Sequence, residues 1–216
     1  MKIDRHGKAK VLTQEEIQRL FTEGLTTDRD RAVCAVMLYT GCRVNEAVSL
    51  KIIDVYDKKG RIRPELIIRK GNTKGKLATR TIPIIDDLRY FLEEYKPVPN
   101  YEGFLFPGRW GKGHLHCHYA SIIFREGCAK VDIEGASTHS LRRTALTQMS
   151  NAGIPLRIIQ EISGHRNLEQ LQIYLEVETS QVRGAMATLS ILTPVVSNNS
   201  SSQVINNIKN KLVTDT

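Results

Sequence analysis

The sequence lacks the features that mark membrane, secreted and disulfide-stabilised proteins. No apolar run reaches the roughly 20 residues of a membrane-spanning helix, and the N-terminal stretch MKIDRHGKAK has no hydrophobic signal core. The four cysteines include no CxxC pair, so reduced thiols are a simpler interpretation than a disulfide framework. The sequence also has no internal repeat. These absences predict a soluble cytoplasmic protein with no membrane partner.

Positive charge exceeds negative charge in an otherwise ordinary globular composition. The 216 residues include 31 lysines and arginines against 23 acidic residues, which gives a formal net charge of +8 and a pI of about 9.4. With 41% apolar residues, the chain is long enough for one large domain or two small ones. The basicity favours a polyanionic partner, most simply nucleic acid. Ribosome-associated and membrane-surface proteins share this balance.

Hydrophobic periodicity and turn residues predict a mainly α-helical fold with a small antiparallel β-sheet, an α+β architecture. The segment ELIIRKGNTKGKLATRTIPI predicts a hairpin with strands near Glu65–Arg69 and Thr79–Ile84. Helical patterns occupy residues 11–24, 28–41, 44–55, 86–95, 118–131, 138–152, 155–164, 167–177 and 180–192. We expect a basic leader over residues 1–10, one domain over residues 11–190 and a polar, flexible tail over residues 191–216.

Two adjacent arginines lie in the stretch STHSLRRTALTQ, at the expected start of a helix. At about 100° per residue, the apolar face that begins at Leu141 passes close to Arg142 and away from Arg143. Arg142 is therefore the better candidate for a group held in a cleft, and Arg143 is expected to be a solvated or backbone-contacting charge. The helix N-terminus near Thr138 adds positive dipole to an anion site.

Three other residues of interest are far apart in the sequence, and each has an ordinary structural explanation. Arg43, at the junction of two helices, is either a helix-start charge stabilised by Glu46 or a rigid fork for phosphate. His165 follows a glycine in a tight turn, where a histidine is usually structural. Tyr174 lies among leucine and isoleucine residues, as a core tyrosine does. None of them identifies a function alone.

Taken in order, these motifs resemble the tyrosine recombinase (phage integrase) family. The sequence contains TGCRVNEA, then a lysine-bearing hairpin, then HSLRR, then GH, and then a tyrosine nine residues later. The resemblance extends from about Val11 to Leu189 and rests on five separated motifs. It implies the fold of the recombinase catalytic domain.

The resemblance also assigns an active site. Two arginines bind the scissile phosphate, two histidines complete the pocket and a tyrosine is the nucleophile: Arg43 and Arg142, His139 and His165, and Tyr174. The family's catalytic lysine lies in the hairpin turn, which here offers Lys70, Lys74 and Lys76. The run TKGKLATRTIPI is similar to the TKT…RTIP form of phage-type integrases and indicates Lys74. Lys70, in RKGN, resembles the KGN form of Xer-type members and is the alternative.

The reaction implied by the resemblance is a transesterification of a DNA phosphodiester that needs no metal, ATP or other cofactor. Tyr174 attacks phosphorus, forms a 3′-phosphotyrosine link and releases a 5′-hydroxyl, which the lysine protonates. The partner is double-stranded DNA. The resemblance further implies a homotetramer in the recombination synapse, a weakly associated or monomeric protein without DNA, and a nucleoid-associated place in a prokaryotic cytoplasm.

The run HLHCH offers a rival site, because alternation would place His114, His116 and His118 on one face of an extended segment. No nearby carboxylate or CxxC pair supports a metal cluster, and the sequence turns helical directly afterwards. A loop that contacts the DNA backbone fits the neighbouring Arg109 and Lys112 better. We therefore expect no metal site.

Two other functions compete with recombination. One is nicking and closing of DNA with type IB topoisomerase chemistry, and the other is a DNA-binding regulator that keeps the fold without turnover. Family members usually carry a helical core-binding domain before the catalytic one, whereas here the catalytic pattern begins near residue 11. We therefore expect either a naturally short recombinase or a fragment without its first domain.

Overall fold

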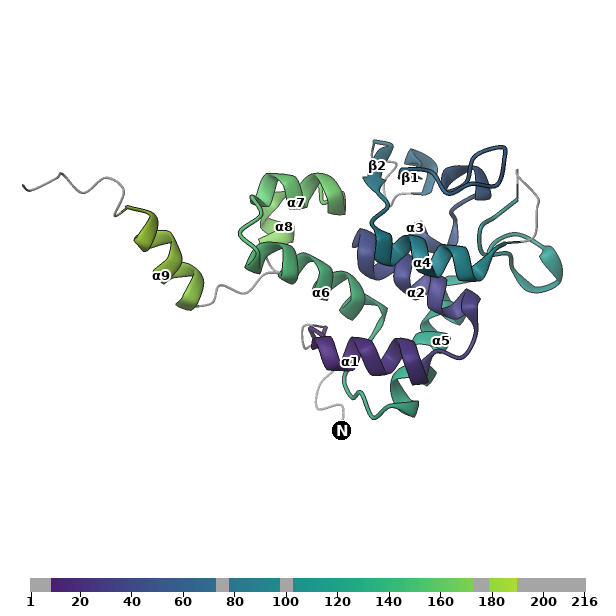
Figure 1. The fold of residues 1–216 in the computed structure, drawn as a ribbon, viewed down its shortest axis with the longest axis horizontal. Coiled ribbons are helices and arrows are strands. Elements are labelled where there is room, and N and C mark those ends of the chain that lie inside the picture. Colours follow the sequence, from purple (N-terminus) through teal and green to yellow (C-terminus); the bar gives the residue numbers. More distant parts are fainter. Residues whose placement is uncertain (1–8, 73–77, 98–102, 173–178, 190–216) are drawn as a thin grey trace, which may run out of the picture. The chain divides into compact units, whose positions relative to one another are not determined.

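The computed structural model describes residues 9–72, 78–97, 103–172 and 179–189 (Figure 1). The chain divides into two units, residues 1–176 and residues 177–216. The described part of the first unit is mostly helical and contains one two-stranded antiparallel sheet, which confirms the predicted fold class. In the second unit the structure describes helix α9 (Thr179–Thr188). None of the helices in the described part of the chain is long and apolar enough to cross a membrane.

Helix α2 (Asp28–Thr40) is the centre of the first unit (Figure 1). The Thr27 hydroxyl accepts a hydrogen bond from the backbone N–H of Asp30 and starts the helix, and Gly41, at φ 59°, ends it. The stretch from Ala32 to Leu38 is buried throughout, as expected of a helix that is apolar around its circumference. Four helices pack against it: α3 (Val44–Val48), α4 (Asp86–Tyr95), α5 (Cys117–Lys130) and α6 (Thr138–Asn151).

The N-terminal helix α1 (Gln14–Arg19) begins at a capping box. The Thr13 hydroxyl accepts a hydrogen bond from the Glu16 N–H (3.1 Å), and the Glu16 carboxylate accepts one from the Thr13 N–H (3.0 Å). The helix continues into a wider turn, η1 (Leu20–Gly24), which packs on α5. The two backbones nearly touch here, because a Cβ atom added to Gly24 would lie 2.5 Å from the carbonyl oxygen of Gly127.

Strands β1 (Glu65–Ile68) and β2 (Arg80–Pro83) form the predicted hairpin, with Ile68 opposite Arg80. Alternate residues face the core, and Ile68 and Ile82 are buried. A short turn, η3 (Lys70–Asn72), follows β1. The next part of the hairpin loop, residues 73–77, lies outside the described residues, and it includes Lys74.

The predicted helix over residues 44–55 is wrong in its second half. Helix α3 ends at Val48, and the Ser49 hydroxyl donates to the carbonyl of Asn45 (2.6 Å). The backbone N–H of Ile52 donates instead to the carbonyl of Gly103 (3.0 Å), and a short turn, η2 (Ile52–Asp54), follows. Pairing with a distant segment therefore overrides the helical pattern.

Helices α7 (Leu156–Ser163) and α8 (Leu168–Gln172) follow α6 along the chain. Leu146 of α6, Ile159 of α7 and Leu171 of α8 form a small apolar cluster between them. Gly164, at φ 64°, ends α7 in the left-handed conformation. The turn that it makes carries His165.

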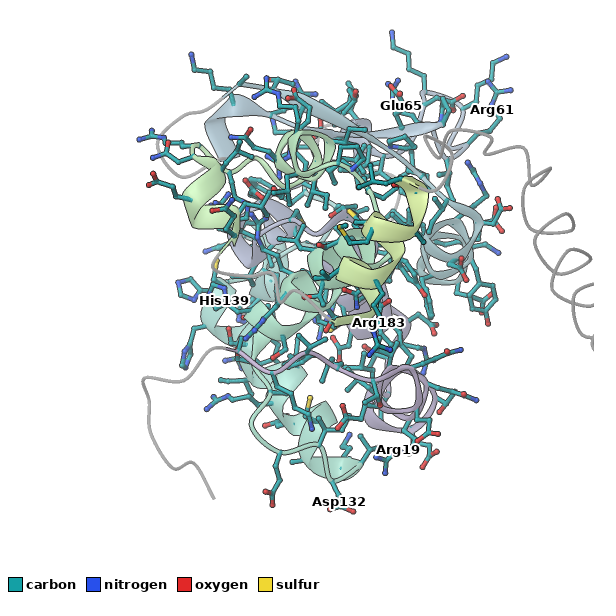
Figure 2. The ribbon with its side chains drawn as sticks, turned by 90° about the vertical axis from the view of Figure 1, so that its left-hand side faces the viewer. Arg19, Arg61, Glu65, Asp132, His139 and Arg183 are labelled. Carbon is teal, nitrogen blue, oxygen red and sulfur yellow. The ribbon has the colours of Figure 1, made fainter. Side chains whose placement is uncertain are left out.

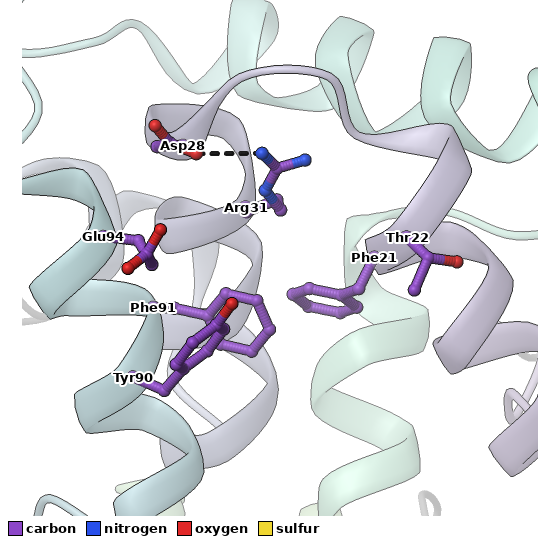
Figure 3. A pocket seen from close by; sticks show the side chains of 7 residues that line it. All are labelled: Phe21, Thr22, Asp28, Arg31, Tyr90, Phe91 and Glu94. Atoms are coloured by element: carbon purple, nitrogen blue, oxygen red, sulfur yellow. Dashed lines mark hydrogen bonds and ion pairs between the residues drawn. The ribbon is translucent and has the colours of Figure 1, made fainter.

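A hollow of about 310 Å³ lies among η1, α2 and α4 (Figure 3). The rings of Phe21 and Phe91 line it, with their centroids 4.9 Å apart, and Tyr90 packs edge-on against Phe91. An ion pair of 2.8 Å joins Asp28 and Arg31 beside it. Of the candidate site residues that the structure describes, none lines this hollow.

Candidate active site

Arg142 lies in the first turns of α6, and its side chain is buried, with a relative exposure of 2%. One end of the guanidinium donates to the carbonyl of Gly41, at the end of α2, and the other end to the carbonyl of Ser163, the last residue of α7 (2.9 Å). Helix C-termini carry partial negative charge, so they hold the buried cation. Burial, and then the charge of Arg43, lower the pKa of Arg142 to about 10. Arg142 therefore remains charged near neutral pH in a fixed orientation.

Arg43 is the N-cap residue of α3, and Glu46 anchors it as expected. The backbone N–H of Arg43 donates to Oε2 of Glu46 (2.8 Å), whereas Nη1 of its guanidinium lies 3.5 Å from Oε1. That Nη1 is buried and has no hydrogen-bond partner among the described residues. A buried donor without a partner is costly. This arrangement is typical of a position that a bound anion completes.

His165, in the turn after α7, is buried next to Arg142, with 7% exposure. Its Nδ1 lies 2.8 Å from the Ser163 hydroxyl, and its Nε2 lies 3.1 Å from Nη2 of Arg142. Burial, followed by the charges of Arg142 and Arg43, lowers the pKa of His165 to about 3. The imidazole is therefore neutral near pH 7.

His139 lies in the first turn of α6, with its side chain exposed at the surface (Figure 2). Partial desolvation of the ring, and then the charges of Arg142 and Arg43, lower its pKa below the ordinary value. The same two arginines lower the pKa of His165. The structure thus brings four of the predicted site residues, Arg43, His139, Arg142 and His165, into one electrostatically coupled group.

The remaining two predicted site residues, Lys74 and Tyr174, lie outside the described residues. Helix α8 is described as far as Gln172, in the segment that leads to the tyrosine. The alternative lysine, Lys70, begins η3, and its backbone N–H donates to the hydroxyl of Thr79 (3.0 Å). The roles of these lysines and of Tyr174 stay predictions.

Of the two alternatives expected for Arg143, a solvated charge is wrong and a charge in contact with backbone agrees with the structure. Its side chain is buried, with 4% exposure, and Nη1 donates to the carbonyl of Ala9 (2.6 Å). The segment before α1 covers this face of α6, and the backbone N–H of Leu12 donates to the hydroxyl of Thr144 (2.8 Å). A helical wheel contains only one helix, so it does not show that another segment covers its polar face.

The histidine run HLHCH serves the local fold. His114 packs its ring against Phe104 (5.2 Å between centroids), and Nδ1 of His116 accepts a hydrogen bond from the His118 N–H at the start of α5. The described part of the chain contains no group of three histidine, cysteine or acidic side chains arranged to hold a metal ion.

Arg80 is a residue of this region that the sequence reasoning missed. It projects from β2 with 9% side-chain exposure, and its Nη2 pairs with Oε2 of Glu46 at 2.9 Å. Burial raises the pKa of Glu46, but the hydrogen bond and charge of Arg80, followed by those of Arg43, outweigh it and lower that pKa overall. The missed signal was strand alternation, which places Arg80 on the same face as the buried Ile82.

Comparison with known proteins identifies the family. The profile of the phage integrase family matches residues 10–181. The tyrosine recombinase XerA of Pyrococcus furiosus is 32% identical over 192 residues, which cover 87% of this chain and 64% of that protein. This chain therefore spans less than two thirds of the length of that relative.

Solved structures agree on the fold. A crystal structure of XerA recombinase has a TM-score of 0.65 at 25% identity, covering 87% of this chain and 67% of that one. XerH site-specific recombinase bound to difH substrate, in a pre-cleavage complex, has a TM-score of 0.63 at 22% identity, covering 82% of this chain and 53% of that one. The chain belongs to the phage integrase family, and its fold is that of the tyrosine recombinase catalytic domain.

Proposed function

We propose that this protein is a site-specific DNA recombinase that breaks and rejoins DNA through a 3′-phosphotyrosine link at Tyr174. The observation that carries the proposal is the buried Nη1 of Arg43, which has no hydrogen-bond partner among the described residues and belongs to a cation whose charge lowers the pKa of the buried Arg142. Glu46 offsets the repulsion between these two cations only in part, and a second anion bound by both would relieve the rest. A DNA phosphate supplies that anion.

In the proposed reaction, the tyrosine hydroxyl attacks the phosphorus atom, and the bond to the 5′-oxygen breaks. Tyr174 becomes esterified to the 3′-phosphate, and Lys74 gives the departing 5′-oxygen its proton. A 5′-hydroxyl from a second strand then attacks the phosphotyrosine and releases the tyrosine. The number of phosphoester bonds is unchanged in each step, so no ATP is consumed.

The two arginines supply the electrostatic part of catalysis. Negative charge gathers on the non-bridging oxygens in the transition state, and the guanidinium groups of Arg43 and Arg142 offer planar pairs of donors for it. His165 adds a neutral hydrogen-bonding group. His139, at the open edge, is in place to accept the tyrosine proton or to bond the phosphate.

The relatives support the choice of partner. XerH structures are pre-cleavage and post-cleavage complexes with difH substrates, and a Tn1549 integrase structure contains circular intermediate DNA. By extension we assign double-stranded DNA to this chain. We further propose a homotetramer on two duplexes, and a cytoplasmic, nucleoid-associated location.

Covalent capture on nicked duplexes tests the proposal. When the duplex has a nick next to the cleavage position, cleavage releases a short strand that carries the 5′-hydroxyl. This strand diffuses away and cannot reseal the break, so the phosphotyrosine link accumulates. A pool of nicked duplexes with randomised centres supplies the unknown target, and denaturing gels separate the adduct. We expect the wild-type protein to form adducts whose DNA is attached at Tyr174, as located by peptide mass spectrometry.

Matched tyrosine variants complete the test. Tyr174→Phe should abolish the adduct, whereas Tyr90→Phe, at an exposed tyrosine of α4, should leave it intact. Adducts that persist in Tyr174→Phe would overturn the nucleophile assignment. Incubation of the captured target with a second labelled duplex then separates strand exchange from simple nicking and closing.

A further inference from the structure

The carboxylate of Glu46 is shared by two arginines, and the pairing is unequal. Arg80 faces it with both terminal nitrogens, Nη2 at 2.9 Å from Oε2 and Nη1 at 3.3 Å from Oε1. The backbone N–H of Arg43 donates to Oε2 of Glu46 at 2.8 Å, but Nη1 of its guanidinium lies 3.5 Å from Oε1. The fork-to-fork partner of Glu46 is therefore Arg80.

Arg80 is itself fixed from two sides. Its Nε donates to the carbonyl of Ile162, near the end of α7, at 2.9 Å. It also lies against Gly164, where an added Cβ would be 2.8 Å from Nη1 of Arg80. Gly164 has φ 64° and directly precedes His165. One side chain thus ties the hairpin to α3 and to the turn that carries the buried histidine.

Without Arg80, Glu46 would lose its bidentate partner and could pair with another cation. The carboxylate is 1% exposed, so water cannot replace a lost cation. The nearest remaining cation is the guanidinium of Arg43. A buried carboxylate that has lost its partner forms a bidentate pair with an adjacent guanidinium. Nη1 of Arg43, now without a hydrogen-bond partner among the described residues, would then be occupied.

We propose that Arg80 is a positioning residue that keeps the guanidinium of Arg43 available to the scissile phosphate, by satisfying the carboxylate that would otherwise capture it. This inference rests on the proposed function, because it assumes that Arg43 binds phosphate. Glu46 then hydrogen-bonds the backbone N–H of Arg43 and keeps only the longer, 3.5 Å ion pair with its guanidinium. The lowered pKa of Glu46 agrees with a carboxylate that stays ionised between its two partners.

A double-variant cycle in the full chain tests the inference, using the nicked duplex captured by the wild-type protein. The variants are Arg80→Gln, Glu46→Gln and the pair together, with Arg61→Gln as the matched control. Arg61 is 72% exposed and forms an ion pair with Asp57. For each protein, the single-turnover rate of adduct formation, the DNA affinity and the melting temperature are measured.

We expect Arg80→Gln to slow adduct formation on the order of a hundredfold, as a misplaced reacting group does, with DNA affinity changed by less than about threefold. The control should match wild type. In the Glu46→Gln background, where no charge remains to capture Arg43, Arg80→Gln should have little further effect. The double variant should therefore react roughly tenfold or more faster than Arg80→Gln alone.

Three results would overturn the inference: a wild-type rate in Arg80→Gln, a double variant as slow as that single variant, or a large loss from Arg80→Gln in the Glu46→Gln background. The last comparison uses Glu46→Gln and the double variant and not the Arg80→Gln single variant, so it stays informative if Arg80→Gln does not fold. Failure of the wild-type protein to form any adduct would instead reject the proposed function, so the two failures are distinguishable.

Discussion

The guanidinium of Arg142 lies against the ring of His165, with Nη2 3.1 Å from Nε2 and 3.3 Å from Nδ1. An arginine only donates hydrogen bonds, so the ring has to accept, and a doubly protonated imidazolium has no free acceptor. The lowered pKa of His165, due to burial and then to the two arginines, agrees with this geometry. Within this pair the arginine carries the charge and the histidine remains neutral.

Arg142 is expected to be indispensable for strand cleavage. Arg142→Lys keeps a positive charge but loses the planar fork that contacts the ends of α2 and α7. We predict that the rate of adduct formation falls on the order of a hundredfold or more in both Arg142→Lys and Arg142→Ala. Single-turnover capture on the nicked duplex measures this, and near-normal rates in the lysine variant would contradict the bidentate role.

Arg143 should matter for stability and much less for chemistry. Arg143→Ala removes the donor from the carbonyl of Ala9 and leaves a cavity beside Ala9, which we expect to cost about 1–3 kcal/mol of unfolding free energy. Urea denaturation measures the loss. Arg157→Ala, at an exposed position, is the control and should change stability by less than about 0.5 kcal/mol. Cleavage per folded molecule should be retained in both variants.

The buried His165 predicts a loss of stability in mild acid. In the unfolded chain its pKa is about 6.5, whereas in the fold it is about 3. Between these values the unfolded state binds a proton that the fold excludes, so stability falls as the pH decreases through this window. Urea unfolding from about pH 7 to pH 4 should show a steeper decline for wild type than for His165→Gln.

The control for this pH dependence is His118→Gln, which removes an exposed histidine. Its stability should follow that of the wild-type protein across the same range. Parallel curves for wild type and His165→Gln would show that the buried ring does not cause the acid sensitivity.

A substrate whose leaving group needs no proton distinguishes which of the two candidate lysines is the general acid. A thiol has a pKa of about 8.5, so a 5′-sulfur leaves without a general acid, unlike a 5′-oxygen. We predict that Lys74→Ala cleaves a normal duplex slowly and a duplex with a 5′-bridging sulfur at nearly the wild-type rate. Lys70→Ala should cleave both as wild type does. Sulfur rescue of Lys70→Ala, with none for Lys74→Ala, would reverse the assignment.

The contact between η1 and α5 should not tolerate a methyl group at Gly24. The added Cβ would lie 2.5 Å from the backbone of Gly127, which cannot rotate away as a side chain does. We expect Gly24→Ala to cost about 1–3 kcal/mol through overpacking. Gly184→Ala, in α9 with open space around it, should be neutral or slightly stabilising. Thermal melts of the two variants compare these outcomes.

Much of the fold was predictable because the signals are local. The predicted bounds of α4, Asp86 to Tyr95, agree with the structure, since acidic residues start this helix and its apolar period is regular. The hairpin strands were placed to within two residues, because alternation sets the strands and the Gly/Asn-rich loop joins them. The truncated helix α3 was not predictable, since its end depends on pairing with Gly103.

The residues of the candidate site likewise fall into two groups, those predicted from sequence motifs and those whose position depends on distant partners. Arg43, His139, Arg142 and His165 were assigned from motif order, and in the structure the charges of the two arginines lower the pKa of both histidines. The burial of Arg143 and the role of Arg80 depend on partners 134 and 34 residues away in the chain, which no local pattern reveals. The assignments of Lys74 and Tyr174 remain predictions from sequence.

The C-terminal ends of α2 and α7 hold the guanidinium of Arg142, and this affects how tightly an anion can bind. Its guanidinium loses most of its water when the protein folds, so an arriving oxyanion need not dehydrate it. The unliganded fold bears that desolvation penalty, together with the repulsion from Arg43, as reduced thermal stability. A small tetrahedral anion such as vanadate should therefore raise the melting temperature by relieving this repulsion, even in the absence of DNA.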